Sequence, residues 1–178
     1  MPVIRAYITG KSIVIFNPEW SRKIYSMGYY GQTTLIPKPK SLDFSSPLEL
    51  SPYDTLYLLE KKVIEVVSSG KMLSFDEAKR IFSGWIENFD VKWFVYRDLR
   101  NKGFVVRSGL KFGGTFVVYK HGPGIDHAPF IVDVMSKNIS PIEIVRAGRL
   151  ATSVRKAFVI ANVQNNRVEY FVFKWFGK

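Results

Sequence analysis

The stretch that decides the fold is YRDLRNKGFVVRSGLKFGGTFVVYKHGPGIDHAPFIV, residues 96–132. A helical pattern ends in it at Gly103, and two apolar segments, 104–107 and 111–119, follow as expected strands. Its last residues open a third expected strand over 130–135. Glycine is favoured just beyond a helix, and short apolar runs between turn residues are typical of strands. The stretch therefore predicts a helix followed by three successive strands.

The flanking residues complete this half of the chain. Asp90 is placed to cap a helix over 91–102, and a capping box between Ser140 and Glu143 starts another helix over about 141–155. Two further apolar segments are expected as interior strands: 157–163 and 168–173. The predicted order is α-β-β-β-α-β-β, a mixed sheet flanked by helices.

The first half of the chain predicts a second, smaller unit. Its expected strands are 3–8, 12–16, 33–36 and 63–67. Its expected helices are 18–27, 52–61 and a third that begins at the capping box of Ser74 and Glu77 and ends near residue 87. We therefore expect an α/β (α+β) protein with a small amino-terminal mixed α/β domain, 1–88, and a carboxy-terminal mixed α/β domain, 89–178.

The composition restricts the chemistry of the chain. Basic residues outnumber acidic residues by 26 to 15, which gives a net charge of +11 and an isoelectric point of about 9.8. This balance favours nucleic acid as the partner, although anionic membranes and acidic partners also suit a basic surface. The chain has no cysteine, which excludes thiolate nucleophiles and zinc sites built on sulfur. Proton transfer near neutral pH is therefore left to the two histidines, His121 and His127.

Segments that would direct the chain to a membrane are not expected. No segment approaches the roughly 18 consecutive apolar residues that a membrane span needs. The opening residues alternate as strands do and lack the apolar core and cleavage site of a secretory signal. We expect a cytoplasmic protein that has no contact with a membrane.

Short motifs for cofactors do not fit. Gly10-Lys11-Ser12 resembles the end of a phosphate-binding loop, but Arg5 stands where that loop requires its first glycine. A metal site drawn from Asp126, His127 and Asp133 stays open as an alternative, because carboxylate and imidazole groups are common ligands. We expect neither a metal nor a cofactor.

A candidate site forms around the end of the second expected strand. Tyr119 ends that strand, and His127 follows a turn rich in glycine and proline. The last expected helix carries a basic stripe at spacings of three, seven and ten residues: Arg146, Arg149, Ser153 and Lys156. If the helix ends early, Lys156 instead opens the next strand. Each side chain taken alone also fits packing or a solvated surface.

These side chains suit the internal attack of an RNA 2′-hydroxyl on the adjacent phosphate. The step needs a base, an acid and a cation that stabilises the charged phosphorane. His127 is the natural acid because its ordinary pKa is about 6.5. Tyr119 is the candidate base and needs positive charge nearby, since its ordinary pKa is about 10. Lys156 supplies that charge and stabilises the phosphorane.

Two segments resemble a known family, the archaeal tRNA-splicing endonucleases (tRNA-intron lyases). They are residues 96–132, quoted above, and RLATSVRKAFVIANV, residues 149–163. LSPYDTLYLLEKKVIEV, residues 50–66, is similar to the amino-terminal domain of the same family. The resemblance implies a carboxy-terminal restriction-endonuclease-like domain after a smaller α/β domain.

The resemblance also implies roles for individual residues. It gives Tyr119 as general base, His127 as general acid and Lys156 as the stabiliser of the transition state. It implies that the chain cuts precursor tRNA at a bulge-helix-bulge without an essential metal and leaves a 2′,3′-cyclic phosphate and a 5′-hydroxyl. Arg149 matches the arginine that holds a bulged base, and Trp175 is the candidate for the second clamp residue.

Two features leave alternatives. His121 competes for the role of the acid, but His127 directly precedes the expected strand, as the family's histidine does. Family homotetramers use an acidic loop before the last long helix, whereas SKNISP, residues 136–141, contains no acid. We therefore expect a catalytic subunit that pairs with itself, through 168–173, and with a homologous structural subunit in a heterotetramer. A non-catalytic RNA-binding or structural subunit of the same complex is the alternative, which the complete set of catalytic residues disfavours.

Overall fold

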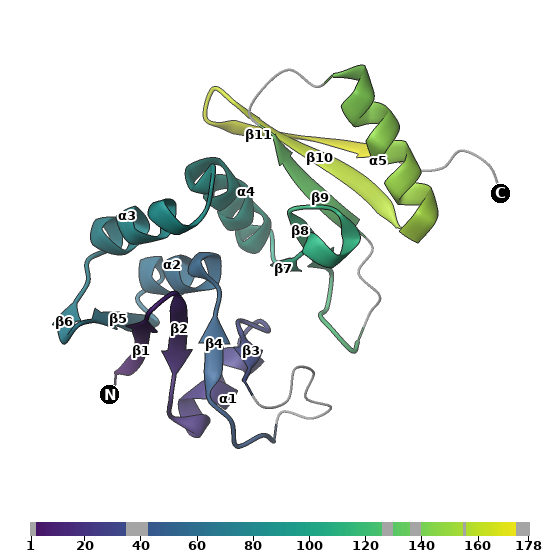
Figure 1. The fold of residues 1–178 in the computed structure, drawn as a ribbon. Helices are drawn as coiled ribbons and strands as arrows, with labels where there is room; N and C mark the ends of the chain where they lie inside the picture. The colour runs from purple at the N-terminus through teal and green to yellow at the C-terminus, as the bar shows by residue number, and fades with distance from the viewer. Residues whose placement is uncertain (1–2, 35–42, 126–129, 136–139, 155, 174–178) are drawn as a thin grey trace. The chain divides into compact units, whose positions relative to one another are not determined.

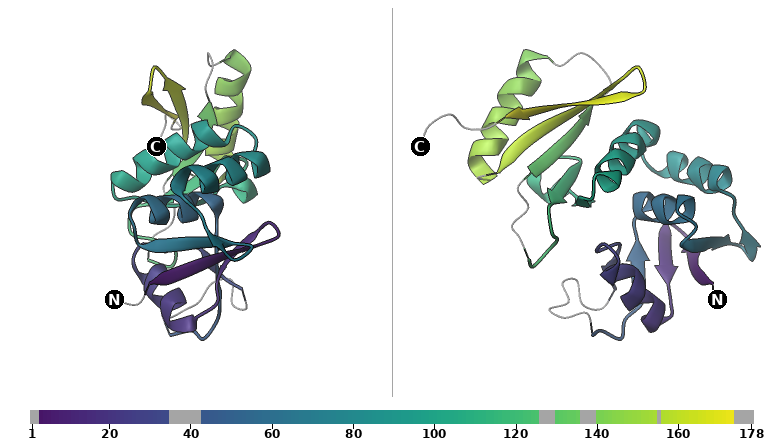
Figure 2. Two further views of the ribbon diagram at one scale, coloured as in Figure 1. Left: turned by 90° about the vertical axis from the view of Figure 1, so that its left-hand side faces the viewer. Right: turned by 180° about the vertical axis from the view of Figure 1, so that it is seen from behind.

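The structure is a computed structural model, and it describes residues 3–34, 43–125, 130–135, 140–154 and 156–173. It divides into two compact units, Met1–Phe89 and Asp90–Lys178, each with a mixed sheet and its own helices (Figures 1 and 2). The α/β class expected from the sequence is confirmed.

Within the described residues, no helix is long and apolar enough to cross a membrane.

The first unit is built on a six-stranded sheet in the order β3-β4-β2-β1-β5-β6. Its strands are β1 (Ile4–Thr9), β2 (Ser12–Ile15), β3 (Gln32–Thr33), β4 (Leu48–Leu50), β5 (Ile64–Ser68) and β6 (Lys71–Met72). β1 and β5 are parallel, and the other neighbours are antiparallel. The alternate residues Ile4, Ala6, Ile13 and Ile15 are buried, so one face of this sheet forms the core of the unit.

The described part of this unit contains the helices α1 (Pro18–Ser26), α2 (Pro52–Glu60) and α3 (Phe75–Trp85). Each helix begins where the sequence predicts, because a local cap determines its first residue. At α3 the backbone N–H of Ser74 donates to Glu77 Oε2 at 2.8 Å, and the N–H of Glu77 donates back to Ser74 Oγ at 3.3 Å. This reciprocal pair satisfies two amides that the first turn of a helix leaves without partners.

The second unit follows the predicted element order. Its elements are α4 (Phe89–Asn101), β7 (Val105–Ser108), the 3-10 turn η1 (Leu110–Phe112), β8 (Phe116–Tyr119), β9 (Phe130–Met135), α5 (Pro141–Val154), β10 (Ala157–Gln164) and β11 (Arg167–Phe173). The sheet order is β11-β10-β9-β8-β7, in which β9 and β10 are parallel and the other pairs antiparallel.

Helices cover both faces of this sheet (Figures 1 and 2). On one face, Ala147 of α5 packs with the buried side chains of Ile131, Phe158 and Ile160. On the other face, α4 contributes Tyr96, whose ring centroid lies 5.8 Å from that of Phe116. Successive side chains of a strand point to opposite faces, so β8, β9 and β10 each contribute to both cores.

Local signals fixed the ends of the helices in this unit. The amide of Gly103 donates to Arg100 O at 2.9 Å, the amide of Phe104 donates to Leu99 O at 3.2 Å, and Gly103 has a φ of +87°. This is the Schellman pattern that glycine favours, and it confirms the predicted stop. The capping box at Ser140 is confirmed as well, since its amide donates to Glu143 Oε2 at 2.7 Å.

Several expectations were wrong. Asp90 lies inside α4, which starts at Phe89, so it does not cap that helix. The expected strand 111–119 begins only at Phe116, because residues 110–112 form the η1 turn. β11 is an edge strand with the exposed side chains Phe171 and Val172, whereas 168–173 was predicted to be interior.

The sequence also missed two short strands of the first unit, β4 and β6. In place of the strand expected at 33–36, the described residues contain β3 at Gln32–Thr33. Residues 35 and 36 of that expected strand lie outside the described residues. These short strands depend on their neighbours in the sheet rather than on a long alternating pattern of their own.

Candidate active site

One end of the second sheet brings together segments that are distant in the sequence. Val118 of β8 is paired with Phe130 of β9, and Phe130 is paired with Ala157 of β10. Tyr119 follows the first of these residues, and Lys156 precedes the last. The carboxyl end of β8 therefore lies at the same end of the sheet as the amino ends of β9 and β10.

Tyr119 and Lys156 lie on either side of the start of β9 at this end of the sheet. Neighbouring strands are about 4.8 Å apart, so β8 and β10 are separated by about 10 Å at this level. The alternation of side chains assigns Tyr119 to the face of Val117, which is the face that α5 covers, because Val117 is paired with Ile131. Lys156 lies in a bend before β10, and its Nζ approaches the ring of Phe112, which packs against the apolar cluster on that same face.

Lys156 lies between the end of α5 at Val154 and the start of β10 at Ala157. This decides between the two sequence-based alternatives: the helix ends before the lysine, and the lysine leads into the strand. Its side chain is half-buried, and its Nζ lies 5.8 Å from the centroid of the Phe112 ring. An ammonium ion at this distance from an aromatic face is attracted by the ring.

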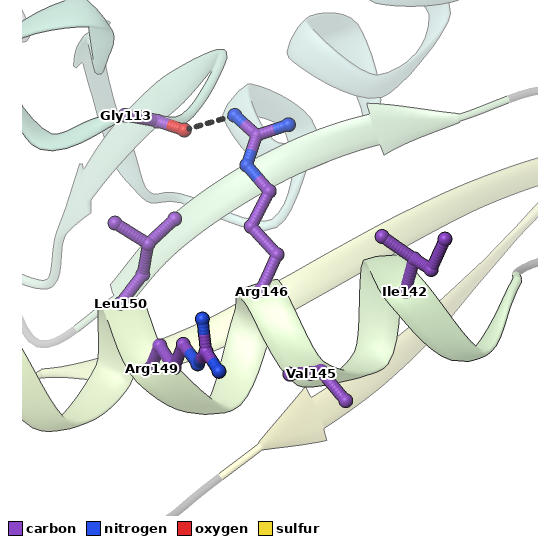
Figure 3. A pocket seen from close by; sticks show the side chains of 6 residues that line it. All are labelled: Gly113, Ile142, Val145, Arg146, Arg149 and Leu150. Carbon is purple, nitrogen blue, oxygen red and sulfur yellow. Dashed lines mark hydrogen bonds between the residues drawn. The ribbon is translucent and has the colours of Figure 1, made fainter.

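The η1 turn carries Phe112 to this position. The amide of Phe112 donates to Gly109 O at 2.8 Å, and Gly113 ends the turn with a φ of +77°. Arg146 of α5 donates from its Nη2 to Gly113 O at 3.2 Å, as Figure 3 shows. This hydrogen bond ties the turn to the basic helix.

A groove lies along the outer side of α5 next to this turn. It has a volume of about 350 Å³ and is lined by Gly113, Ile142, Val145, Arg146, Arg149 and Leu150 (Figure 3). A second hollow continues along the helix past Arg149 to Thr152 and Ser153. Ile142 and Val145 are exposed, with 80% and 53% of their surface accessible. Two guanidinium groups beside apolar side chains suit a ligand that has both phosphates and flat bases.

The basic charge of the chain gathers in the unit that contains this groove. Residues 90–178 contain 15 basic and 6 acidic residues, a net charge of +9, whereas residues 1–89 contain 11 and 9, a net charge of +2. Non-specific attraction to a polyanion therefore acts mainly on the second unit.

Two of the expected site residues, His127 and Trp175, lie outside the described residues. His121 is exposed and lies two residues after the end of β8. Of the alternative metal ligands, Asp126 and His127 are also outside the described residues, while Asp133 Oδ1 accepts a hydrogen bond from Thr115 Oγ1 at 2.8 Å. Among the residues that are described, no three carboxylate or imidazole side chains gather as a metal site would require.

Sequence reasoning missed Phe112, Ile142 and Val145. Phe112 lies in a segment that was predicted to be a strand, where an apolar residue is expected and does not indicate a functional role. The spacing of 142, 145 and 149 along a helix did contain a signal, because these positions share one side of it. Only their exposure distinguishes this side from the core side, which holds Ala147.

Comparisons with known proteins match both units. The family model of the tRNA intron endonuclease N-terminal domain matches residues 4–79, and that of the tRNA intron endonuclease catalytic C-terminal domain matches residues 89–170. A tRNA-splicing endonuclease of Hyperthermus butylicus is 46% identical over 97% of this chain and 98% of its own length. Proteins of the same name from Saccharolobus islandicus and Sulfurisphaera tokodaii are 41% and 45% identical, over 97% and 92% of this chain and 98% and 93% of their own lengths.

Proposed function

The chain belongs to the tRNA intron endonuclease family, and we propose that it cuts precursor tRNA at bulge-helix-bulge splice sites by a metal-independent reaction. Its relatives match nearly the whole chain and are named tRNA-splicing endonucleases, so the chain is an RNA endonuclease of tRNA splicing. The observation that supports this proposal is that Tyr119 and Lys156 lie at the same end of the sheet, on either side of the start of β9.

The proposed reaction is an internal transfer of the phosphoryl group. Tyr119, as its phenolate, accepts the proton of the 2′-hydroxyl, and the 2′-oxygen forms a bond to the adjacent phosphorus. The bond between phosphorus and the 5′-oxygen breaks, and His127 donates a proton to that oxygen. Lys156 stabilises the additional negative charge of the phosphorane. The products are a 2′,3′-cyclic phosphate and a 5′-hydroxyl, and no oxidant, metal or cofactor takes part.

The groove along α5 is the proposed binding surface for the RNA around the cut. Arg149 holds a bulged base by stacking and charge, and Arg146 binds the backbone beside it. Trp175 is the proposed second side of the base clamp. Replacing Arg146 or Arg149 by Ala should weaken RNA binding and reduce the salt slope of log K by about one for each phosphate that the variant no longer neutralises.

We further propose that the chain acts as a catalytic subunit. It pairs with a second copy through the exposed edge of β11 and with a homologous structural subunit in a heterotetramer. Among the described strands, β11 lies at the edge of its sheet and carries the exposed apolar side chains Phe171 and Val172. Sedimentation of the chain with and without the partner tests this assembly, and efficient cutting by a homo-oligomer would contradict it.

The reaction is tested on a bulge-helix-bulge RNA with and without EDTA, followed by analysis of the RNA ends. We expect cutting in EDTA, cyclic phosphate ends and no cutting of an RNA with a single 2′-deoxy substitution at the splice site. Loss of cutting in EDTA or 3′-hydroxyl products would reject the mechanism.

Variants of the catalytic residues complete the test. Lys156→Ala and Tyr119→Phe should each slow the single-turnover rate by roughly 10² to 10⁴, the usual size of such contributions. Leu110→Ala, which removes a side chain that is 81% exposed, serves as the matched control. Wild-type rates in both catalytic variants would favour a non-catalytic subunit.

A further inference from the structure

Phe112 presents a fixed aromatic face to Lys156. The lysine Nζ lies 5.8 Å from the centroid of the ring, within the range of a cation–π interaction. The ring itself packs against the apolar cluster of Ile131, Ala147 and Phe158, beneath α5. A lysine side chain is among the most flexible in proteins, whereas this ring is partly buried against the apolar cluster.

The turn that carries the ring is closed by an internal hydrogen bond and held by contacts with α5 and with the sheet. Gly113 donates its amide to Leu110 O at 3.2 Å, and its own carbonyl accepts from Arg146 Nη2 at 3.2 Å (Figure 3). Gly114 passes so close to the sheet that an added Cβ would stand 2.5 Å from Ile131 Cγ2. These contacts restrain the backbone of the turn next to Phe112.

We propose that Phe112 is a positioning residue that holds the ammonium group of Lys156 beside the scissile phosphate. The inference deepens the proposed function and rests on the role given there to Lys156. An aromatic face suits this task because it attracts the ammonium ion without cancelling its charge. A carboxylate in the same place would compete with the phosphorane for the lysine. The ring thus reduces the freedom of the side chain without adding a counter-charge of its own.

A purely structural role for Phe112 predicts a different response to substitution. Phe112→Leu keeps an apolar side chain in the core but removes the aromatic face, whereas Phe112→Tyr keeps the face. Replacing Phe112 by 3,4,5-trifluorophenylalanine keeps the shape of the ring and weakens only its electrostatic attraction. This last variant also decides the question if Phe112→Leu does not fold.

The experiment measures single-turnover cutting of a bulge-helix-bulge RNA at saturating protein, in the assembly that cuts wild-type RNA, together with the Kd for that RNA. We expect the Leu and trifluorinated variants to be slower by roughly three- to tenfold, which corresponds to the usual strength of a cation–π contact. Their Kd should stay unchanged, and Phe112→Tyr should cut at nearly the wild-type rate. In proton NMR spectra, Lys156 Hε signals should be shifted upfield by the ring and should return to their ordinary position in Phe112→Leu.

A double-mutant cycle with Lys156→Ala separates this inference from the proposed function. If Phe112 acts through the lysine, adding Phe112→Leu to Lys156→Ala should cause no further loss of rate. Equal losses in both backgrounds, or wild-type rates in the trifluorinated variant, would overturn the positioning role and leave the role of Lys156 intact. If Lys156→Ala itself cuts at the wild-type rate, the proposed catalytic role of the lysine fails, whatever the Phe112 variants do.

Discussion

Two glycine-to-alanine substitutions in the second unit should have opposite effects on stability. In Gly114→Ala the new Cβ would stand 2.5 Å from Ile131 Cγ2 and 3.2 Å from Val132 O. Carbon atoms normally approach to about 3.5–4.0 Å, so the side chain must move by about 1 Å. Ile131 is fully buried and branched at Cβ, which leaves it little freedom to move. Overpacking of this kind costs roughly 1–3 kcal/mol.

Gly148→Ala is the matched control within the same unit. Gly148 lies inside α5, and its added Cβ meets no atom within 4 Å. Alanine is favoured over glycine in a helix interior by about 1 kcal/mol, so this variant should be more stable than the wild type. The two variants therefore differ by about 2–4 kcal/mol, although the chemical change is the same in both.

Amide hydrogen exchange measures this difference separately in each unit. For the slowest amides of β8 and β9, Gly114→Ala should exchange roughly 5- to 150-fold faster than the wild type, since about 1.4 kcal/mol corresponds to a factor of ten. Gly148→Ala should exchange about fivefold more slowly. Wild-type exchange rates in Gly114→Ala would refute the close packing of the turn on the sheet.

Two further predictions concern contacts away from the candidate site. Tyr170 Oη donates to Asp98 Oδ2 at 2.6 Å, so Tyr170→Phe should lower the free energy of unfolding by roughly 1.5 kcal/mol, seen as a lower urea midpoint with an unchanged slope. Burial, with help from the Asp98 carboxylate, raises the pKa of Tyr170 above its ordinary 10.0, so this contribution should decline as the pH rises above about 10 and be absent in the variant. The hydrogen bond from Lys71, followed by those from Ser74, lowers the pKa of Glu77 from 4.5 to about 2. Its stabilisation should be complete above pH 4.5 and disappear as the pH falls to about 2, and the acid unfolding of Glu77→Gln, followed by circular dichroism, should lack this dependence.

Because β11 lies at the edge of the sheet, its apolar residues need a different explanation from burial in the interior of the sheet. A run of apolar residues predicts an interior strand, but Phe171 and Val172 are 42% and 51% exposed in the single chain. The same composition is expected of an edge that another chain covers, because the partner completes the sheet and buries the exposed side chains. The pattern identified the strand correctly but could not distinguish these two environments.

The sequence by itself determined the boundaries of most helices and the order of the elements in the second unit. The capping box of Ser74 and Glu77 and the stop at Gly103 depend on hydrogen bonds between residues only three to five positions apart. Such contacts form wherever the local residues allow them, so a short window of sequence is enough to predict them.

Only the tertiary structure determined which side chains lie together at one end of the second sheet. The register of three strands brings Tyr119 and Lys156 to the same end of the sheet. Phe112 reaches Lys156 because its segment forms the η1 turn instead of the predicted strand, and its ring packs against the core cluster. Strand order and register arise from the pairing and burial of residues far apart in the chain, which no local pattern specifies. The sequence therefore supplied the candidate catalytic side chains, and the long-range pairing of the strands gave two of them a common place.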